Sequence, residues 1–103
     1  MKTTRNMYFE KSDEARELEV FTMNYPPLWY STIEPNITNL QRIAKRGKYD
    51  HNKALTACYN IANAGAKAYY KEFCTTGYTF TVTQRYTAAC MILEYIENQY
   101  INA

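Results

Sequence analysis

The stretch that decides the fold is DHNKALTACYNIANAGAKAYYKEFCTTGYTFTVTQRYTAACMILEYIENQYINA, residues 50–103. Its apolar residues recur in steps of four and three, which is the spacing of a seam between two packed helices. One helix is expected at about 50–73 and the other at about 82–100. The seam positions are Leu55, Tyr59, Ala62, Ala66, Tyr69 and Phe73, then Val82, Tyr86, Ala89, Leu93, Ile96 and Tyr100. The sequence therefore predicts an antiparallel helical hairpin.

If the chain folds back at Gly77 and Tyr78, this turn determines which residues of the two helices face each other. Seam residues then meet seam residues, and the expected pairs are Phe73 with Val82, Tyr69 with Tyr86, and Tyr59 with Ile96. Small residues near the middle of both helices predict a close approach there: Ala62, Ala64, Gly65, Ala66, Ala88 and Ala89. We expect this register to be correct within one turn.

Residues 12–46 are expected to supply the N-terminal helices that cover one side of the hairpin. The first of them begins near Ser12 with good helix formers and with acids in its first turns. Partial alternation over 18–22 leaves a strand as the alternative. Pro26 and Pro27 end this element.

The rest of the N-terminal half is expected to form a short helix at about 27–33 and a longer one at about 35–46. Pro35 should break or kink the chain between them. Gly47 is a natural C-terminal stop, and Asp50 can cap the helix that follows. Thr81 or Thr83 should cap the last helix. Trp29 has the largest side chain and is expected to fill the centre of the core.

The length of 103 residues fits one domain, which we expect to be a small all-α domain of four or five helices with an extended arm at 1–11. The N-terminus lacks the apolar core of a secretory signal, and no window reaches the roughly 20 apolar residues of a membrane span. The three cysteines, Cys58, Cys74 and Cys90, do not form a disulfide pattern. A reducing, cytoplasmic setting is expected, without contact to a membrane.

Catalytic and metal-binding constellations are missing from the sequence. The cysteines lie far apart and His51 is the single histidine, so a zinc site is not expected. No thiol or hydroxyl is placed beside a base, and the three glycines do not form a phosphate loop. We therefore expect a protein that is not an enzyme and has no cofactor.

A basic segment at 42–53 is the candidate for nucleic-acid contact, through Arg42, Lys45, Arg46, Lys48 and Lys53. The net charge of +2 is too small to decide on partners. Cations are also favoured at a helix C-terminus by the helix dipole. The acidic run at 10–19 offers them a partner within the chain.

Tyrosine is abundant, with eleven copies, and gives large contact areas at low entropic cost. The connector at 74–81 brings aromatic residues close to Arg85, a combination that is common in binding hot spots. The alternative is a structural role for Arg85, with Glu72 or a carbonyl of the connector as its partner. The candidate protein-binding residues are Tyr70, Tyr78, Phe80, Arg85 and Tyr95.

Three blocks, RGKYDHNKAL (46–55), AKAYYKEF (66–73) and FTVTQRYTAA (80–89), resemble a pattern in small uncharacterised proteins of tailed bacteriophages. The resemblance covers about residues 45–97 and carries over no catalytic or binding residue. It implies a phage-encoded accessory protein, made early in infection, that acts in the host cytoplasm.

The leading hypothesis is therefore a non-enzymatic protein that binds and inhibits or redirects a host protein, such as a component of a defence system, or binds another phage protein. The alternative is a nucleic-acid-binding protein that uses the segment 42–53. If the N-terminal helices cover only one side of the hairpin, Met91, Ile92 and Tyr95 would form a homodimer interface.

Overall fold

The computed structural model describes residues 13–73 and 80–102, and every element in these ranges is helical. The elements are α2 (Asp13–Met23), α3 (Pro26–Leu28), η1 (Trp29–Ile33), α4 (Glu34–Lys45), α5 (His51–Phe73), α6 (Val82–Ile96) and η2 (Glu97–Ile101), where η denotes a π-helical segment. The predicted all-α class is confirmed. The arm at 1–11 and the turn at Gly77 and Tyr78 lie outside the described residues.

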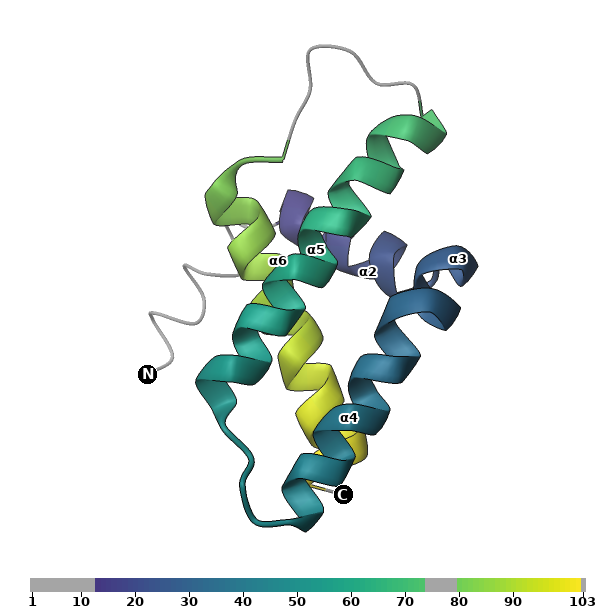
Figure 1. Ribbon diagram of the computed structural model, residues 1–103. Coiled ribbons are helices and arrows are strands. Elements are labelled where there is room, and N and C mark those ends of the chain that lie inside the picture. The colour runs from purple at the N-terminus through teal and green to yellow at the C-terminus, as the bar shows by residue number, and fades with distance from the viewer. Residues whose placement is uncertain (1–12, 74–79, 103) are drawn as a thin grey trace.

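The hairpin consists of α5 and α6, which cross each other at the centre of the molecule (Figure 1). Asp50 caps α5, because its Oδ1 accepts from the backbone N–H of Asn52 at 2.9 Å. Thr81 caps α6 in a capping box, in which its side chain and that of Gln84 each accept from the other's backbone N–H. Both predicted caps are confirmed, so local sequence determines where the two helices begin.

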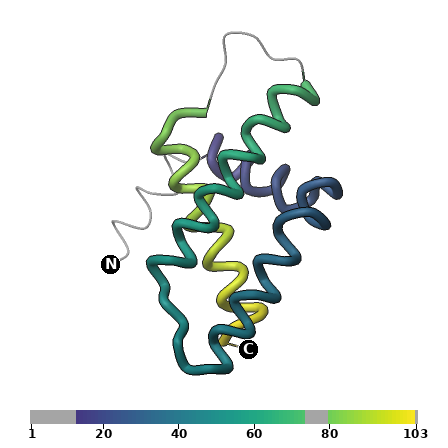
Figure 2. The backbone as a smooth tube through the Cα atoms, viewed as in Figure 1, coloured from purple at the N-terminus to yellow at the C-terminus, as the bar shows by residue number. Residues whose placement is uncertain are grey.

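The predicted register of the hairpin is wrong by about two to three turns. The ring of Tyr86 lies 6.4 Å from that of Tyr59, whereas Tyr69 was its expected partner. The error arose because the chain was assumed to turn at the midpoint of the connector. Phe80, at the far end of the connector, instead packs beside α5 with its ring 5.1 Å from that of Tyr69. The last turn of α5 therefore extends past the start of α6, as Figure 2 shows.

This shift changes which seam residues are buried. Phe73 and Val82 do not pack on each other and are 58% and 61% exposed. In the middle of the hairpin the seam is correct, since Ala62, Ala66 and Leu93 are buried. Gly65 meets Thr22 of α2, so part of the small-residue stretch serves the approach of α2 to α5.

The run from α3 to α4 is helical without a break, so the first of the two outcomes expected at Pro35, a break in the helix, is wrong. The π-helical segment η1 immediately precedes this proline, and the N–H of Glu34 bonds the carbonyl of Trp29 five residues back. A proline lacks an N–H and its ring collides with the carbonyl four residues earlier, so the wider turn accommodates it within the helix. Gly47, with φ of +72°, ends α4 as predicted.

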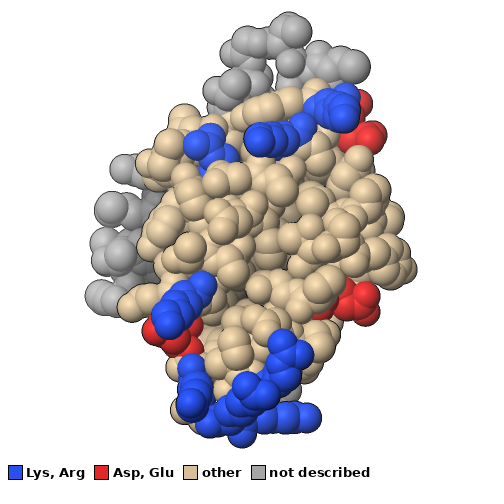
Figure 3. Space-filling model, viewed as in Figure 1, with Lys and Arg blue, Asp and Glu red and all other residues tan. Residues whose placement is uncertain are grey.

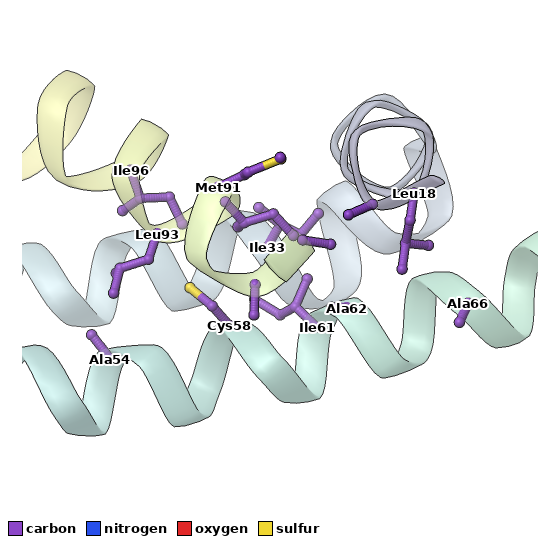
Figure 4. Close-up of a cluster of buried hydrophobic side chains, with 14 of the residues drawn as sticks. Leu18, Ile33, Ala54, Cys58, Ile61, Ala62, Ala66, Met91, Leu93 and Ile96 are labelled. Carbon is purple, nitrogen blue, oxygen red and sulfur yellow. The ribbon is translucent and has the colours of Figure 1, made fainter. Parts of the chain in front are cut away.

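The core lies where α2, η1, α5 and α6 converge, and Figure 4 shows Leu18, Ile33, Ile61 and Leu93 directed into it. The largest fully buried side chain is Phe80, which is 1% exposed. Trp29 is only half-buried at the edge of the core, so the expectation that it plugs the core is wrong. Phe80 has this role because its ring packs against Tyr69 and Tyr70 of α5.

The helix α2 packs against both α5 and α6, and its helical state rules out the strand alternative. Met91 and Ile92 are buried within the chain, on the helix that α2 covers. The expected homodimer interface through Met91, Ile92 and Tyr95 is therefore wrong, since only Tyr95 is exposed.

Candidate interaction surfaces

The residues predicted to bind a partner near the connector are mostly engaged within the chain. Phe80 is in the core, and its backbone N–H donates to the hydroxyl of Tyr70. Arg85 donates from Nε to Asn63 Oδ1 at 2.8 Å and from a terminal nitrogen to the carbonyl of Phe80. Tyr78 lies outside the described residues. Arg85 thus ties the start of α6 to α5, which is the structural alternative stated for it. The expected bond to a carbonyl of the connector is confirmed at Phe80, and the other partner is Asn63 in place of Glu72.

The register shift leaves a hollow between α5 and α6, of about 450 Å³. It is lined by Leu55, Thr56, Tyr59, Val82, Thr83 and Tyr86. Four of these six were assigned to the buried seam, yet Val82 and Tyr86 are 61% and 48% exposed. Sequence periodicity identified these residues but assigned them to the interior, because exposure depends on register.

A second hollow of about 350 Å³ follows along the same two helices. It is lined by Asn63, Ala66, Lys67, Tyr70 and Arg85. We refer to the two hollows together as the α5–α6 furrow. No Asp or Glu is among the described residues that line either hollow. The furrow is thus apolar at one end and cationic at the other.

The basic segment forms one end of the molecule, which we call the basic end: Arg42, Lys45, Arg46, Lys48 and Lys53. All five side chains are exposed, and no ion pair joins them to a carboxylate in the described part of the chain. Arg42 donates to the amide oxygen of Asn39 at 2.6 Å. On the face that Figure 3 shows, cations gather at the end formed by the turn between α4 and α5.

The acidic residues of α2 do not neutralise the basic end. Glu17 accepts from the Tyr69 hydroxyl on α5, one turn from Phe73 at the opposite end of that helix. Glu97 of η2 also lies beside the basic turn, where it accepts from Tyr49 at 2.6 Å and contacts His51 Nδ1 at 2.7 Å. These bonds attach the turn to the end of the hairpin and leave its lysines and arginines to solvent.

In the described part of the chain, no three His, Cys, Asp or Glu residues lie close enough together to hold a metal ion. Cys58 is fully buried, and burial, followed by the nearby Glu97 charge, raises the pKa of its thiol to about 12. Such a thiol is a poor nucleophile at neutral pH. Cys74 lies outside the described residues.

None of the described helices combines the length and apolar character that a bilayer crossing requires. The chain matches no protein-family model, no curated protein and no solved structure.

Proposed function

We propose that this chain is a non-enzymatic interaction protein that binds a helical segment of another protein in the α5–α6 furrow. The observation that supports the proposal is the exposure of Val82 and Tyr86 beside Leu55 and Tyr59. Contiguous apolar surface of this kind is characteristic of interaction sites. A channel between two helices also suits the apolar face of a third helix.

The charges of the furrow define the chemistry of the partner segment. Lys67 and Arg85 line one end, the other end is apolar, and carboxylates are lacking among the described lining residues. From Leu55 to Tyr70 the furrow follows about 22 Å of α5. The partner is therefore an amphipathic helix of about four turns, with one apolar face and acidic residues toward one end.

The source of the partner follows from the resemblance to small phage proteins. Under this proposal the chain is a phage accessory protein that acts in the host cytoplasm, and occupation of the furrow inhibits or redirects a host protein. The candidates Tyr70 and Arg85 line the furrow, whereas Tyr95 lies on α6 outside it.

The test is affinity purification from host lysate with tagged full-length chain, treated with nuclease, followed by binding of the purified partner. Tyr86→Glu places a negative charge in the furrow and should abolish recovery of a stoichiometric protein. Tyr30→Glu, at a side chain that is 70% exposed on η1, is the matched control and should leave recovery unchanged. Equal recovery with Tyr86→Glu would contradict the proposal, as would recovery of nucleic acid alone.

Nucleic acid is the second candidate partner, favoured by the five exposed cations of the basic end without carboxylate partners in the described chain. Binding would use phosphate contacts and would weaken steeply as salt rises. The double variant Arg46→Glu/Lys48→Glu should abolish it. Lys67→Glu/Lys71→Glu changes net charge equally at distant positions of α5 and should preserve binding. If the first variant still binds as wild type does, this candidate is wrong.

A further inference from the structure

A second cavity, of about 410 Å³, lies outside the furrow, and three of its six described lining residues are aromatic. We call it the aromatic cavity, and its described lining residues are Trp29, Tyr95, Tyr100, Met23, Glu19 and Asn24. Its volume falls within the range of small-molecule sites. The rings of Tyr95 and Tyr100 are 6.2 Å apart and inclined at 68°. They thus form two walls that meet at an angle.

The two π-helical segments each supply one aromatic wall. Trp29 begins η1, and Tyr100 lies in η2, where the N–H of Asn102 bonds the Glu97 carbonyl at 2.7 Å. In the described chain, π-helical geometry occurs only in these two segments. Departures of this kind from regular α-helix are frequent at functional sites. Both of them here contribute to one cavity, which distinguishes it from an incidental surface hollow.

Glu19 gives the cavity a negative group. Burial raises the pKa of this carboxyl, and the charge of Arg16 partly opposes that effect. A neighbouring hollow of about 310 Å³ shares Glu19 and Tyr95 with the cavity and contains Arg16 and Glu94. A cation against the aromatic faces would compensate the partly desolvated Glu19 carboxylate without displacing Arg16 from the neighbouring hollow.

We propose that the aromatic cavity binds a quaternary alkylammonium group, held by the faces of Trp29, Tyr95 and Tyr100 and by the charge of Glu19. Aromatic walls with one carboxylate suit a cation of this kind. A primary ammonium carries three N–H donors that must be satisfied on burial. A quaternary group has no N–H to satisfy, so the aromatic rings can surround it without supplying acceptors.

The chain contains a reporter for this site, because Trp29 is its single tryptophan. Full-length protein should be titrated with choline and, at the same ionic strength, with 3,3-dimethylbutanol, which has the same shape without the charge. Choline should change the Trp29 fluorescence with saturation, and the neutral isostere should bind about tenfold or more weakly. Equal binding of both compounds, or a response that does not saturate with choline, would overturn the proposal.

Variants that retain Trp29 test the walls and the charge separately. Tyr95→Leu, at a side chain that is 44% exposed, and Glu19→Gln should each weaken choline binding several-fold. Tyr30→Leu is the matched control, next to the reporter but absent from the described lining, and should bind as wild type does. Choline should also raise the Tm of wild type but not that of Tyr95→Leu. Unchanged affinity in both test variants would contradict the proposed site.

Discussion

A Cβ atom on Gly65 would lie 2.9 Å from the Cβ and Cγ2 atoms of Thr22 and closer still to its Oγ1. The two residues therefore mark a point of close contact between α2 and α5. Thr22 is buried, short and β-branched, so it has little freedom to move aside. The absence of a side chain at position 65 allows α2 to cover the hairpin.

Gly65→Ala should consequently destabilise the protein. Overpacking costs about 1–3 kcal/mol, and the better helix propensity of alanine returns about 1 kcal/mol. Because the overlap is severe, we expect a net loss of about 2 kcal/mol in the free energy of unfolding. Urea denaturation measures it. Combining the change with Thr22→Ala should recover part of the loss, and strictly additive effects in this double-mutant cycle would contradict the described contact.

Phe80→Ala should be the most destabilising of the aromatic truncations, at about 3–5 kcal/mol, because this ring is fully buried between Tyr69 and Tyr70. Phe73→Ala is the matched comparison at the exposed end of α5 and should cost less than about 1 kcal/mol. Thermal or urea denaturation of both variants tests the register directly. The predicted symmetric hairpin would require comparable losses, since it buries Phe73 against Val82.

Thr81→Ala should cost about 1 kcal/mol by removing the side-chain acceptor of the capping box at the start of α6. Thr83→Ala removes the same atoms two residues later, in the first turn, where the hydroxyl has no capping role. It should change stability by less than about 0.5 kcal/mol. Similar losses for both variants would show that the box contributes nothing.

Stability should fall at high pH because of Cys58. The pKa of this thiol is raised in the fold to about 12 from its ordinary value of 9.0. The folded state then retains a proton that the unfolded state has lost, so stability is intact below pH 9.0 and declines toward pH 12. The decline is at most about 1.4 kcal/mol per pH unit for one group.

Cys58→Ala should make this decline shallower in urea denaturation measured between pH 8 and 10. It should not remove the decline, because burial and Glu97 also raise the pKa of Tyr49. In wild type at neutral pH, a thiol reagent should modify Cys58 only after unfolding. Rapid modification of Cys58 in the native protein, or identical pH profiles for the two proteins, would refute the assignment.

The local features of the fold could be predicted from sequence because each depends on a few neighbouring residues. Asp50 and Thr81 cap their helices, Gly47 ends α4, and apolar periodicity identifies both hairpin helices. The register could not be predicted, because it depends on where Phe80 packs after the connector. The position at which Phe80 packs along α5 therefore decides whether Tyr86 is buried or exposed.

The candidate interaction surfaces also differ in whether they could be predicted from the sequence. The basic end was evident because its cations lie close together in the sequence and need only remain exposed. The furrow and the aromatic cavity combine residues from distant segments, such as Tyr59 with Tyr86 and Trp29 with Tyr100. Their signal in the sequence was only an abundance of tyrosine, which does not indicate which rings meet.

The π-helical segments also determine where the chain can lose a residue without changing which side chains face the core. A π turn accommodates one more residue than an α turn, so deleting one residue within 29–33 would restore a regular helix there. Because the wider turn already absorbs the extra residue, the residues on either side of the deletion would keep their relative orientation. A deletion inside the regular helix α5 would instead rotate one side by about 100° relative to the other. A single-residue deletion in η1 that retains Trp29 should therefore preserve the packing of the flanking helices, and a deletion in the middle of α5 should disrupt it.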